Sequence, residues 1–271
     1  MSTSSNSYNF IRNLVASRSG NVVSQAQNYL IENRVSPVAK QAGFDSLEEF
    51  VAYLRLHATS PLTDTVAEAM TINETSFFRD RLPFDALRSH VFPQMAARPF
   101  APRRLNIWSA ACASGQEPYS LAMTALETAA AKDLFIQILA TDISETMVAR
   151  TREAVYTQFE VNRGLTTDQR RRFFIPANDK WQVKPEIQTV VQAQKANLLR
   201  LPVFVSQHDV VFLRNVLLYF DKPTKELILN NIRRHIRDDG YLFLGGGETM
   251  ISLNVPFKPE TVGRVVCFRP C

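Results

Sequence analysis

The fold is decided by two consecutive stretches, Leu105-Asn-Ile-Trp-Ser-Ala110 and Ala111-Cys-Ala-Ser-Gly-Gln-Glu-Pro-Tyr-Ser120. The first is an apolar run of strand length. The second passes through small residues into a helix that Pro118 can begin, since its missing N–H costs nothing in the first turn. A strand, a tight turn and a helix N-terminus form the layout in which backbone approaches a nucleotide-like cofactor. Gly115 stands alone where a dinucleotide fingerprint has three glycines, which argues against a pyrophosphate-binding loop.

Strands alternate with helices beyond these stretches, and the alternation predicts a mostly parallel sheet covered on both faces. The stretch from Tyr156 to Asn197 breaks the pattern with prolines, a glycine and the cluster Arg170-Arg171-Arg172, and predicts an inserted subdomain. The arginine cluster is also typical of a solvated helix face. The predicted strands are 105–110, 135–142, 209–215, 240–245 and 263–269, with short strands at 181–183 and 188–193 in the insertion; the predicted helices are 118–130, 144–153 and 223–237.

Apolar residues recur at helical spacing before these strands, between Tyr8 and Ala69, and predict an all-helical domain of roughly four helices. Asp45 followed by Glu48 is a capping-box pattern that predicts a helix start. A further helix is expected over 84–97, and a connector rich in proline and arginine over 98–104. The predicted domains are therefore a helical domain at 1–80, a helix and connector at 81–104, and an α/β domain at 105–271 with its insertion at 156–197.

The amino-acid composition limits the classes of protein to which the chain can belong. Hydrophobic residues make up 45% of the 271 residues and charged residues 21%, as in soluble globular proteins. No apolar run approaches the roughly 18 residues that a membrane span needs, so no membrane insertion is expected. The polar N-terminus lacks the pattern of a secretory signal, which predicts a cytoplasmic protein. The three cysteines, Cys112, Cys267 and Cys271, form no C-x-x-C pair and indicate neither a disulfide framework nor a metal site.

Charge is distributed unevenly along the chain. Residues 1–80 contain 6 Lys and Arg against 8 Asp and Glu, whereas residues 81–271 contain 25 against 18. A positive field steers acidic partners, which include nucleic acid, acidic membrane and acidic protein surfaces. Charge alone does not choose among these partners.

Two carboxylates together favour one cofactor. Asp142 ends the second predicted strand, where a carboxylate can accept both ribose hydroxyls of a nucleoside. Glu117 opens the first helix of the α/β domain, where it would repel a phosphate and attract a cation. S-adenosylmethionine satisfies both, because it contains a ribose and also carries ammonium and sulfonium charges. Each carboxylate taken alone is equally typical of a helix N-terminus.

Four segments resemble, in order, the chemotaxis receptor glutamate methyltransferases, the CheR family. They are Asn73-Glu-Thr-Ser-Phe-Phe-Arg79, Trp108-Ser-Ala-Ala-Cys-Ala-Ser-Gly-Gln-Glu-Pro-Tyr-Ser-Leu-Ala122, Ala140-Thr-Asp-Ile143 and Leu213-Arg-Asn-Val-Leu-Leu-Tyr-Phe-Asp221. The resemblance covers nearly the whole chain. It implies a helical N-terminal domain followed by a Rossmann-like S-adenosylmethionine-dependent methyltransferase domain with a small inserted β-subdomain. It also implies methylation of glutamate side chains on receptors, giving glutamyl methyl esters.

The resemblance also implies roles for single residues. Glu117 and Asp142 would hold the amino and ribose ends of the cofactor, and the Asn197-Leu198 pair would flank its adenine. Arg79 and Tyr219 would be the catalytic residues, with Arg79 orienting the acceptor carboxylate and Tyr219 lining the path of the methyl group. The full set of implied cofactor contacts is Asn73, Thr75, Arg79, Glu117, Asp142, Asn197, Leu198, Arg214 and Asn215.

The sequence departs from the family pattern at two places. Gln116 replaces an acid that is often found there, and Gly246-Gly247 replaces a His-Ser pair before Glu248. Neither change removes a group implied in methyl transfer. No general base is needed either, because a glutamate with a pKa near 4.3 is already ionised at neutral pH.

Two other functions fit parts of the sequence. A nucleic-acid methyltransferase would use the basic surface, and Phe173-Phe174 beside the arginine cluster offers limited aromatic stacking. A non-enzymatic sensor of S-adenosylmethionine would not need Arg79, Asn215 and Tyr219, so their presence argues against it. The expected partner is the cytoplasmic helical region of a chemotaxis receptor, bound by a monomeric enzyme without nucleic acid.

The insertion predicts how the receptor is found. Some family members grip a flexible tether at the receptor C-terminus through a longer, glycine-containing loop of the β-subdomain. Here the matching stretch, residues 174–183, is compact and contains no glycine. Pro176 opposes the addition of a peptide strand, which needs an open edge and close backbone approach. We expect recognition without the tether, through basic residues of the helical domain and the insertion; the alternative is that loop length varies without functional consequence.

Overall fold

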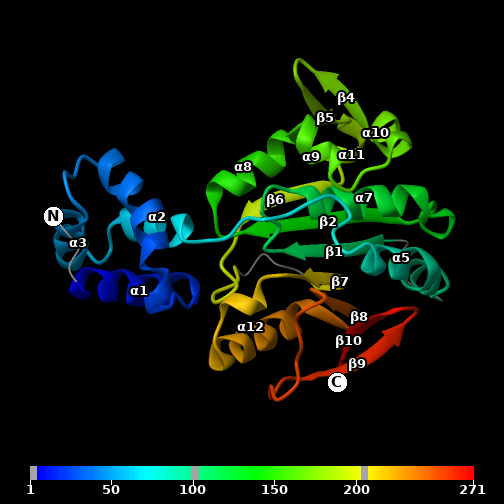
Figure 1. Ribbon diagram of the computed structural model, residues 1–271. Helices are drawn as coiled ribbons and strands as arrows, with labels where there is room; N and C mark the ends of the chain where they lie inside the picture. Colours follow the sequence, from blue (N-terminus) through cyan, green and yellow to red (C-terminus); the bar gives the residue numbers. More distant parts are fainter. Residues whose placement is uncertain (1–4, 99–103, 203–206) are drawn as a thin grey trace. The chain divides into compact units, whose positions relative to one another are not determined.

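The computed structural model describes residues 5–98, 104–202 and 207–271, and the chain forms two compact units (Figure 1). The first unit comprises the residues up to Ile72 together with residues 219–225, and the second comprises residues 73–218 and 226–271. Most of the predicted connector, residues 99–103, lies outside the described residues. In the described part of the chain, no helix is both long and apolar enough to cross a membrane.

The first unit is helical, as predicted. Its core consists of apolar side chains at helical spacing, including the fully buried Ile11, Val15, Ile31 and Phe50. The predicted helix start is one residue off, because the hydroxyl of Ser46, and not Asp45, accepts the N–H of Glu49, at 3.2 Å. The helices are α1 (Ser5–Ser19), a 3-10 turn η1 (Gln25–Gln27), α2 (Asn28–Gln41), α3 (Leu47–Leu56) and α4 (Pro61–Ala69).

The helical unit ends earlier than the sequence indicates. The predicted domain ran to residue 80, whereas residues 73–80 belong to the second unit. The physical reason is that Phe77 and Phe78 are 1% and 5% exposed and lie in the core of the second unit. These rings therefore fix segment 73–80 to the α/β unit.

The second unit is built on a seven-stranded sheet with the strand order β6-β2-β1-β7-β8-β10-β9. The strands from β6 to β8 run parallel, and β10 runs antiparallel to both β8 and β9. The mixed α/β sheet confirms the predicted fold class. The strands are β1 (Arg104–Ala110), β2 (Phe135–Asp142), β6 (Val191–Lys195), β7 (His208–Leu213), β8 (Ile236–Leu244), β9 (Phe257–Val262) and β10 (Val265–Pro270).

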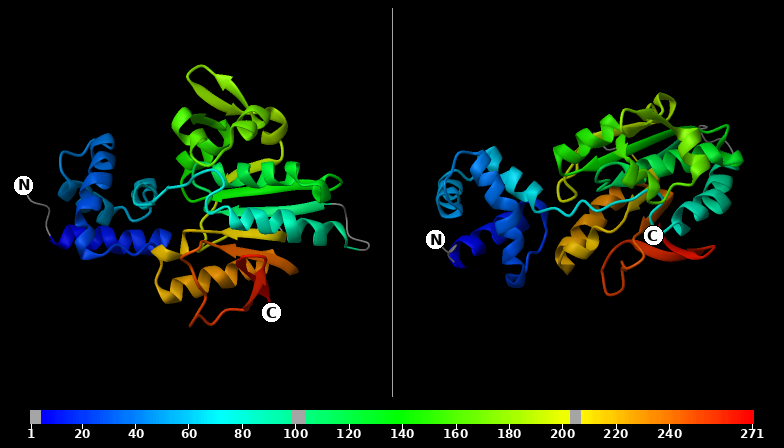
Figure 2. Two further views of the ribbon diagram at one scale, coloured as in Figure 1. Left: turned by 45° about the vertical axis from the view of Figure 1, so that its right-hand side comes forward. Right: turned by 45° about the horizontal axis from the view of Figure 1, so that its top comes forward.

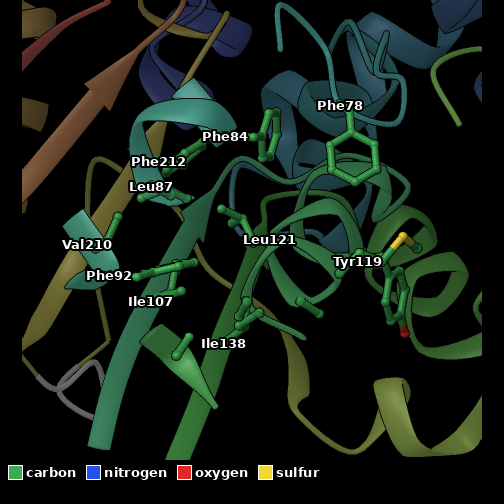
Figure 3. Close-up of a cluster of buried hydrophobic side chains, with 14 of the residues drawn as sticks. Phe78, Phe84, Leu87, Phe92, Ile107, Tyr119, Leu121, Ile138, Val210 and Phe212 are labelled. Carbon is green, nitrogen blue, oxygen red and sulfur yellow. The ribbon is translucent and has the colours of Figure 1, made fainter. Parts of the chain in front are cut away.

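Helices cover the sheet (Figure 1). Figure 3 shows one side of this core, where Phe84, Leu87 and Phe92 approach Ile107 and Phe212 of the strands. The helix predicted over 84–97 is interrupted by a π turn, η2. The helices are α5 (Leu82–Ala86), η2 (Leu87–Val91), α6 (Phe92–Ala96), α7 (Gln116–Glu127), η3 (Ala129–Ala131), α8 (Glu145–Glu153) and α12 (Lys222–His235), with η4 (Leu217–Tyr219) before α12.

An inserted subdomain with its own three-stranded sheet, in the order β3-β5-β4, follows α8 (Figure 2). The predicted short strand at 181–183 lies within β5. The short strand predicted at 188–193 was wrongly assigned to the insertion. Val191 pairs with Ile138, so it begins β6, the edge strand of the main sheet. The elements are β3 (Val155–Thr157), α9 (Gln158–Asn162), α10 (Thr167–Phe173), β4 (Phe174–Ala177), β5 (Lys180–Val183) and α11 (Pro185–Gln188).

Candidate functional site

The candidate site lies where the central parallel strands end. β1 pairs with β2 on one side and with β7 on the other, so the strand order reverses at β1. In open α/β sheets such a switch point, at the carboxyl ends of the strands, is where ligands bind. Four loops that leave this edge contain predicted site residues, namely Glu117 after β1, Asp142 at the end of β2, Asn197 and Leu198 after β6, and Arg214 and Asn215 after β7.

The loop after β1 turns through left-handed backbone at three positions. Ala111, Ala113 and Gly115 have φ values of 61°, 48° and 93°. A Cβ atom on Gly115 would lie 2.8 Å from the hydroxyl of Tyr156 and 2.9 Å from Thr151, so only glycine fits there. The small residues of the sequence are therefore required by the turn itself.

Buried side-chain hydroxyl groups hold this loop in place through hydrogen bonds to backbone carbonyls. Tyr156 donates to the carbonyl of Ser114 at 2.9 Å, and Thr151 donates to the carbonyl of Ala113 at 3.2 Å. Tyr119 in turn donates to the carbonyl of Thr151 at 2.9 Å. Burial raises the pKa of both tyrosines, so the phenols keep their protons and remain donors. The loop is thus rigid before any ligand arrives.

Asp142 lies against this loop. One carboxylate oxygen accepts the N–H of Ala113 and the other accepts the N–H of Ser144, each at 2.9 Å. The carbonyl of Asp142 accepts the N–H of Ala196 at 2.9 Å, which brings the Asn197 loop alongside. A carboxylate has about four lone-pair sites, so these oxygens can accept further hydrogen bonds. The structure therefore brings together the loops that the sequence assigned to one ligand.

Arg214 is a buried charge at the end of β7, with its side chain 1% exposed. It donates to Glu117 at 2.9 Å, to the carboxylate of Asp80 at 2.7 Å and to the carbonyl of Arg79 at 2.9 Å. The second oxygen of Glu117 accepts the hydroxyl of Ser109 at 2.8 Å. Because a buried cation is costly unless it is paired, these contacts fix the relative positions of β7, α7 and segment 73–80.

Glu248 organises the backbone that follows Arg214. Its two oxygens accept four N–H groups, those of Asn215 at 2.8 Å, Val216 at 2.9 Å, Leu217 at 2.7 Å and Gly245 at 2.7 Å. Asn215 has a left-handed φ of 57°. A Cβ on Gly245 would lie 2.6 Å from the amide nitrogen of the Asn215 side chain. Glu248 and Gly245 together therefore define the turn after β7.

Segment 73–80, which contains Asn73, Thr75 and Arg79, is fixed to this unit at two points. The N–H of Phe78 donates to the hydroxyl of Ser120 on α7 at 2.9 Å. On the insertion side, a Cβ on Gly164 would lie 1.9 Å from the carbonyl oxygen of Phe77, so the two backbones are in close contact.

Arg79 keeps donors available. Its guanidinium donates to the carbonyl of Glu74 at 2.8 Å, and no carboxylate of the described residues forms a salt bridge with it. The carboxylate of Glu74 pairs with Arg163 at 2.8 Å; this hydrogen bond is the largest cause of its lowered pKa, and the charge of Arg79 is the next. These contacts place Arg79 in the same unit as Glu117 and Asp142.

Tyr219 is not placed with the other predicted residues. It belongs to the first unit, where its carbonyl accepts the N–H of Val22 at 2.9 Å, and its catalytic role stays a prediction. Cys112 lies in the loop after β1, where burial, followed by the charge of Asp142, raises its pKa well above the usual value. Its thiol therefore stays protonated and is unsuited to nucleophilic chemistry.

Asn197 and Leu198 lie in a loop with its own hydrogen bonds. The side-chain oxygen of Asn197 accepts the N–H of Leu199 at 3.0 Å, and the carbonyl of Leu198 accepts from Asn231 at 3.1 Å. Both residues follow β6, and their role beside the adenine stays a prediction.

The residues of this arrangement that received no role from the sequence include Ser109, Asp80, Gly164 and Glu248. Of these, only Glu248 stands out in the sequence, because it is an acidic residue directly after three glycines. Its partners are up to 33 positions away, so the sequence alone did not connect them.

The fold and the loop arrangement define a class, the S-adenosylmethionine-dependent methyltransferases, and comparison with known proteins supports this. Residues 73–266 match the family described as CheR methyltransferase, SAM binding domain, and residues 6–71 match CheR methyltransferase, all-alpha domain. The chain belongs to the CheR methyltransferase family, and S-adenosylmethionine is its cofactor.

Relatives in several bacteria align over most of their length. The chain is 36% identical to chemotaxis protein methyltransferase Cher2 of Pseudomonas putida, over 93% of this chain and 94% of that protein. It is 36% identical to chemotaxis protein methyltransferase 1 of Pseudomonas aeruginosa, over 93% of both chains. The chemotaxis protein methyltransferase of Vibrio parahaemolyticus is 35% identical, over 93% of this chain and 92% of that protein.

The charges at the strand ends fit this cofactor. Glu117, Asp80 and Asp142 contribute three carboxylates, whereas Arg214 is the cation paired with the first two. The excess of negative charge suits a cationic ligand and disfavours a phosphate. The ribose is an uncharged diol, for which a carboxylate such as that of Asp142 is a suitable acceptor.

Glu248→Gln tests the turn after β7. An amide offers one acceptor oxygen in place of two, and its NH₂ group faces N–H donors, so we expect a loss of about 3 kcal/mol or more in unfolding free energy. Denaturant unfolding measures this. Glu153→Gln, on the exposed side of α8, is the matched control and should stay within about 0.5 kcal/mol. Equal stabilities of the two variants would contradict the assignment.

Proposed function

We propose that the protein methylates glutamate side chains on the cytoplasmic helical region of chemotaxis receptors and so forms glutamyl methyl esters. The observation that carries the proposal is Arg79, a guanidinium that forms no salt bridge among the described residues, held on the segment that Arg214 fixes to Glu117. An arginine fork suits bidentate binding of a carboxylate. The names of the relatives support a receptor as substrate, and we propose that the enzyme acts in the cytoplasm as a monomer.

In this reaction the main task of the protein is to place the acceptor carboxylate next to the methyl group. Bound S-adenosylmethionine supplies an electrophilic methyl group, and an ionised glutamate oxygen is already a nucleophile at neutral pH. Arg79 binds and orients this carboxylate, so that no general base is required. Orientation of this kind supplies up to about 7 to 11 kcal/mol.

In this proposal some residues contact the cofactor directly, and others hold those residues in place. Asp142 holds the ribose and Glu117 the amino group, while Asn197 and Leu198 flank the adenine. The side chain of Arg214 is 1% exposed, so it acts through Glu117 and Asp80. The remaining proposed contacts are Asn73, Thr75, Arg79 and Asn215; a role for Tyr219 on the path of the methyl group is implied by the family resemblance alone.

The arginine cluster of the insertion favours a protein substrate over nucleic acid. Arg170 lies over the ring of Trp181 at 5.2 Å, and Arg172 lies over the ring of Phe173 at 5.0 Å. Phe173 and Phe174 are each 3% exposed. Aromatic faces that are covered or buried cannot stack on bases, which nucleic-acid binding of this type needs.

Transfer of labelled methyl groups from S-adenosylmethionine to a receptor cytoplasmic fragment tests the proposal. We expect label on the receptor that is released as methanol by mild base, because carboxylate esters are base-labile whereas methylated amines are not. A receptor fragment in which the labelled glutamates are replaced by alanine is the control. Base-stable label on the wild-type receptor would refute ester formation.

Arg79→Ala should lower kcat by about 100-fold or more while leaving cofactor affinity within about threefold, because its proposed contact is with the incoming carboxylate. Arg79→Lys should recover the activity only in part, since an ammonium lacks the planar fork. Arg234→Ala, an exposed arginine of α12, is the control. Turnover of Arg79→Ala at the wild-type rate would remove Arg79 from the mechanism.

We also propose that receptor recognition does not require a C-terminal tether. β4 is an edge of the inserted sheet, and Pro176 within it lacks an N–H for pairing with a further strand. The β4–β5 turn at Asn178 and Asp179 is short, and Asn178 is left-handed with a φ of 54°. The insertion thus offers little backbone to an added strand.

A receptor without its last five residues should be methylated at the rate of the intact receptor, and calorimetry should detect no binding of the free pentapeptide. Cofactor binding in the same preparation controls for active protein. Pentapeptide binding with an affinity comparable to that of the cofactor would show that this enzyme uses the tether.

A further inference from the structure

An apolar pocket of about 690 Å³ lies beside the methyl-transfer site, within the second unit. The loop from Gly245 to Val255, which connects β8 and β9, and the β9–β10 hairpin form most of its wall, and residues 80–83 complete it; Figure 2 shows the loop and the hairpin in orange and red. Its lining is mainly apolar and includes Leu244, Met250, Leu253, Val255, Phe257 and Phe268. A pocket of this size and composition is typical of binding sites.

Large apolar side chains at the pocket are left in solvent. Leu82 is 40% exposed, Val266 50% and Ile251 81%, and all three line the pocket. Single exposed apolar residues are ordinary, but several gathered around one apolar hollow indicate an interaction site.

The pocket shares residues with the site already described. Asp80, which holds Arg214, and Glu248, which holds the turn after β7, both line it, as does Gly245. A group in this pocket is therefore adjacent to the elements that place the acceptor carboxylate. The pocket thus shares part of its wall with the residues that hold Arg214 and the turn after β7.

The charges of the pocket favour an acidic partner. The two carboxylates in its lining already have partners, since Asp80 pairs with Arg214 and Glu248 accepts four backbone N–H groups. Arg264 lines the pocket, is exposed, and has no acidic partner among the described residues. The pocket thus offers an apolar hollow with one available cation.

We infer that this pocket receives apolar side chains of the receptor segment that carries the acceptor glutamate, while Arg264 pairs with an acidic residue of the same segment. The inference rests on the proposed function. On a helix, residues three and four positions from the acceptor lie about 5–6 Å from it, so an acceptor at the site brings its neighbours to the adjoining pocket. A segment rich in glutamates supplies the acidic partner.

Kinetics with a receptor cytoplasmic fragment test this inference. Ile251→Asp and Arg264→Glu should each raise the KM for the receptor about tenfold or more, with cofactor affinity measured by calorimetry unchanged. Leu126→Asp, 48% exposed on α7, and Arg234→Glu, exposed on α12, make the same chemical changes outside the pocket and should leave KM within about twofold. A receptor variant with a lysine at the pairing acidic position should restore the KM of Arg264→Glu.

The outcomes separate this inference from the proposed function. If the wild-type enzyme forms base-labile methyl esters but both pocket variants keep the wild-type KM, the pocket inference is wrong and the proposed function stands. Weaker cofactor binding by Ile251→Asp would show that the pocket serves the cofactor, and a change in oligomeric state would assign it to a second copy of the chain; either result overturns the inference. Absence of receptor methylation by the wild-type enzyme would overturn the proposed function first.

Discussion

The site depends on the burial of one guanidinium, that of Arg214. A cation with 1% of its side chain exposed is tolerated only with charged partners, and Glu117 and Asp80 supply them at 2.9 Å and 2.7 Å. These partners lie on α7 and on segment 73–80, so satisfying the charge also joins the end of β7 to both. The segment that contains Arg79 is thereby fixed close to the carboxylates at the strand ends.

A further carboxylate, that of Glu248, completes the arrangement by accepting hydrogen bonds from backbone N–H groups. Glu248 accepts the N–H groups of residues 215–217, which follow Arg214 directly. Arg214, directly after β7, is thus fixed by charge, and the following turn is fixed by hydrogen bonds. Because both contacts are made inside the protein, the strand ends are ordered before a ligand binds, and binding need not supply the entropy of ordering them.

The sequence predicts the parts of this structure that depend on local pattern. β1, β2 and the loop after β1 follow from apolar runs and small residues, whereas the shared cofactor role of Asp142 and Glu117 stays a prediction. Local pattern did not predict β9, where only the two end residues, Phe257 and Val262, are buried and which lies at the edge of the sheet beside β10. It also did not predict Asp80 as the partner of Arg214, because the two are 134 positions apart.

The central claim is that the carboxylates at the strand ends form the cofactor site, and calorimetric binding of S-adenosylhomocysteine to Asp142→Asn and Asp142→Ala tests it most directly. Both variants remove the charge-assisted acceptor, and circular dichroism confirms that each remains folded. We expect both variants to bind S-adenosylhomocysteine at least about tenfold more weakly than the wild type, because each loses one or more charge-assisted hydrogen bonds. The loss of affinity should be larger for Asp142→Ala than for Asp142→Asn. Wild-type affinity in the folded variants would contradict it.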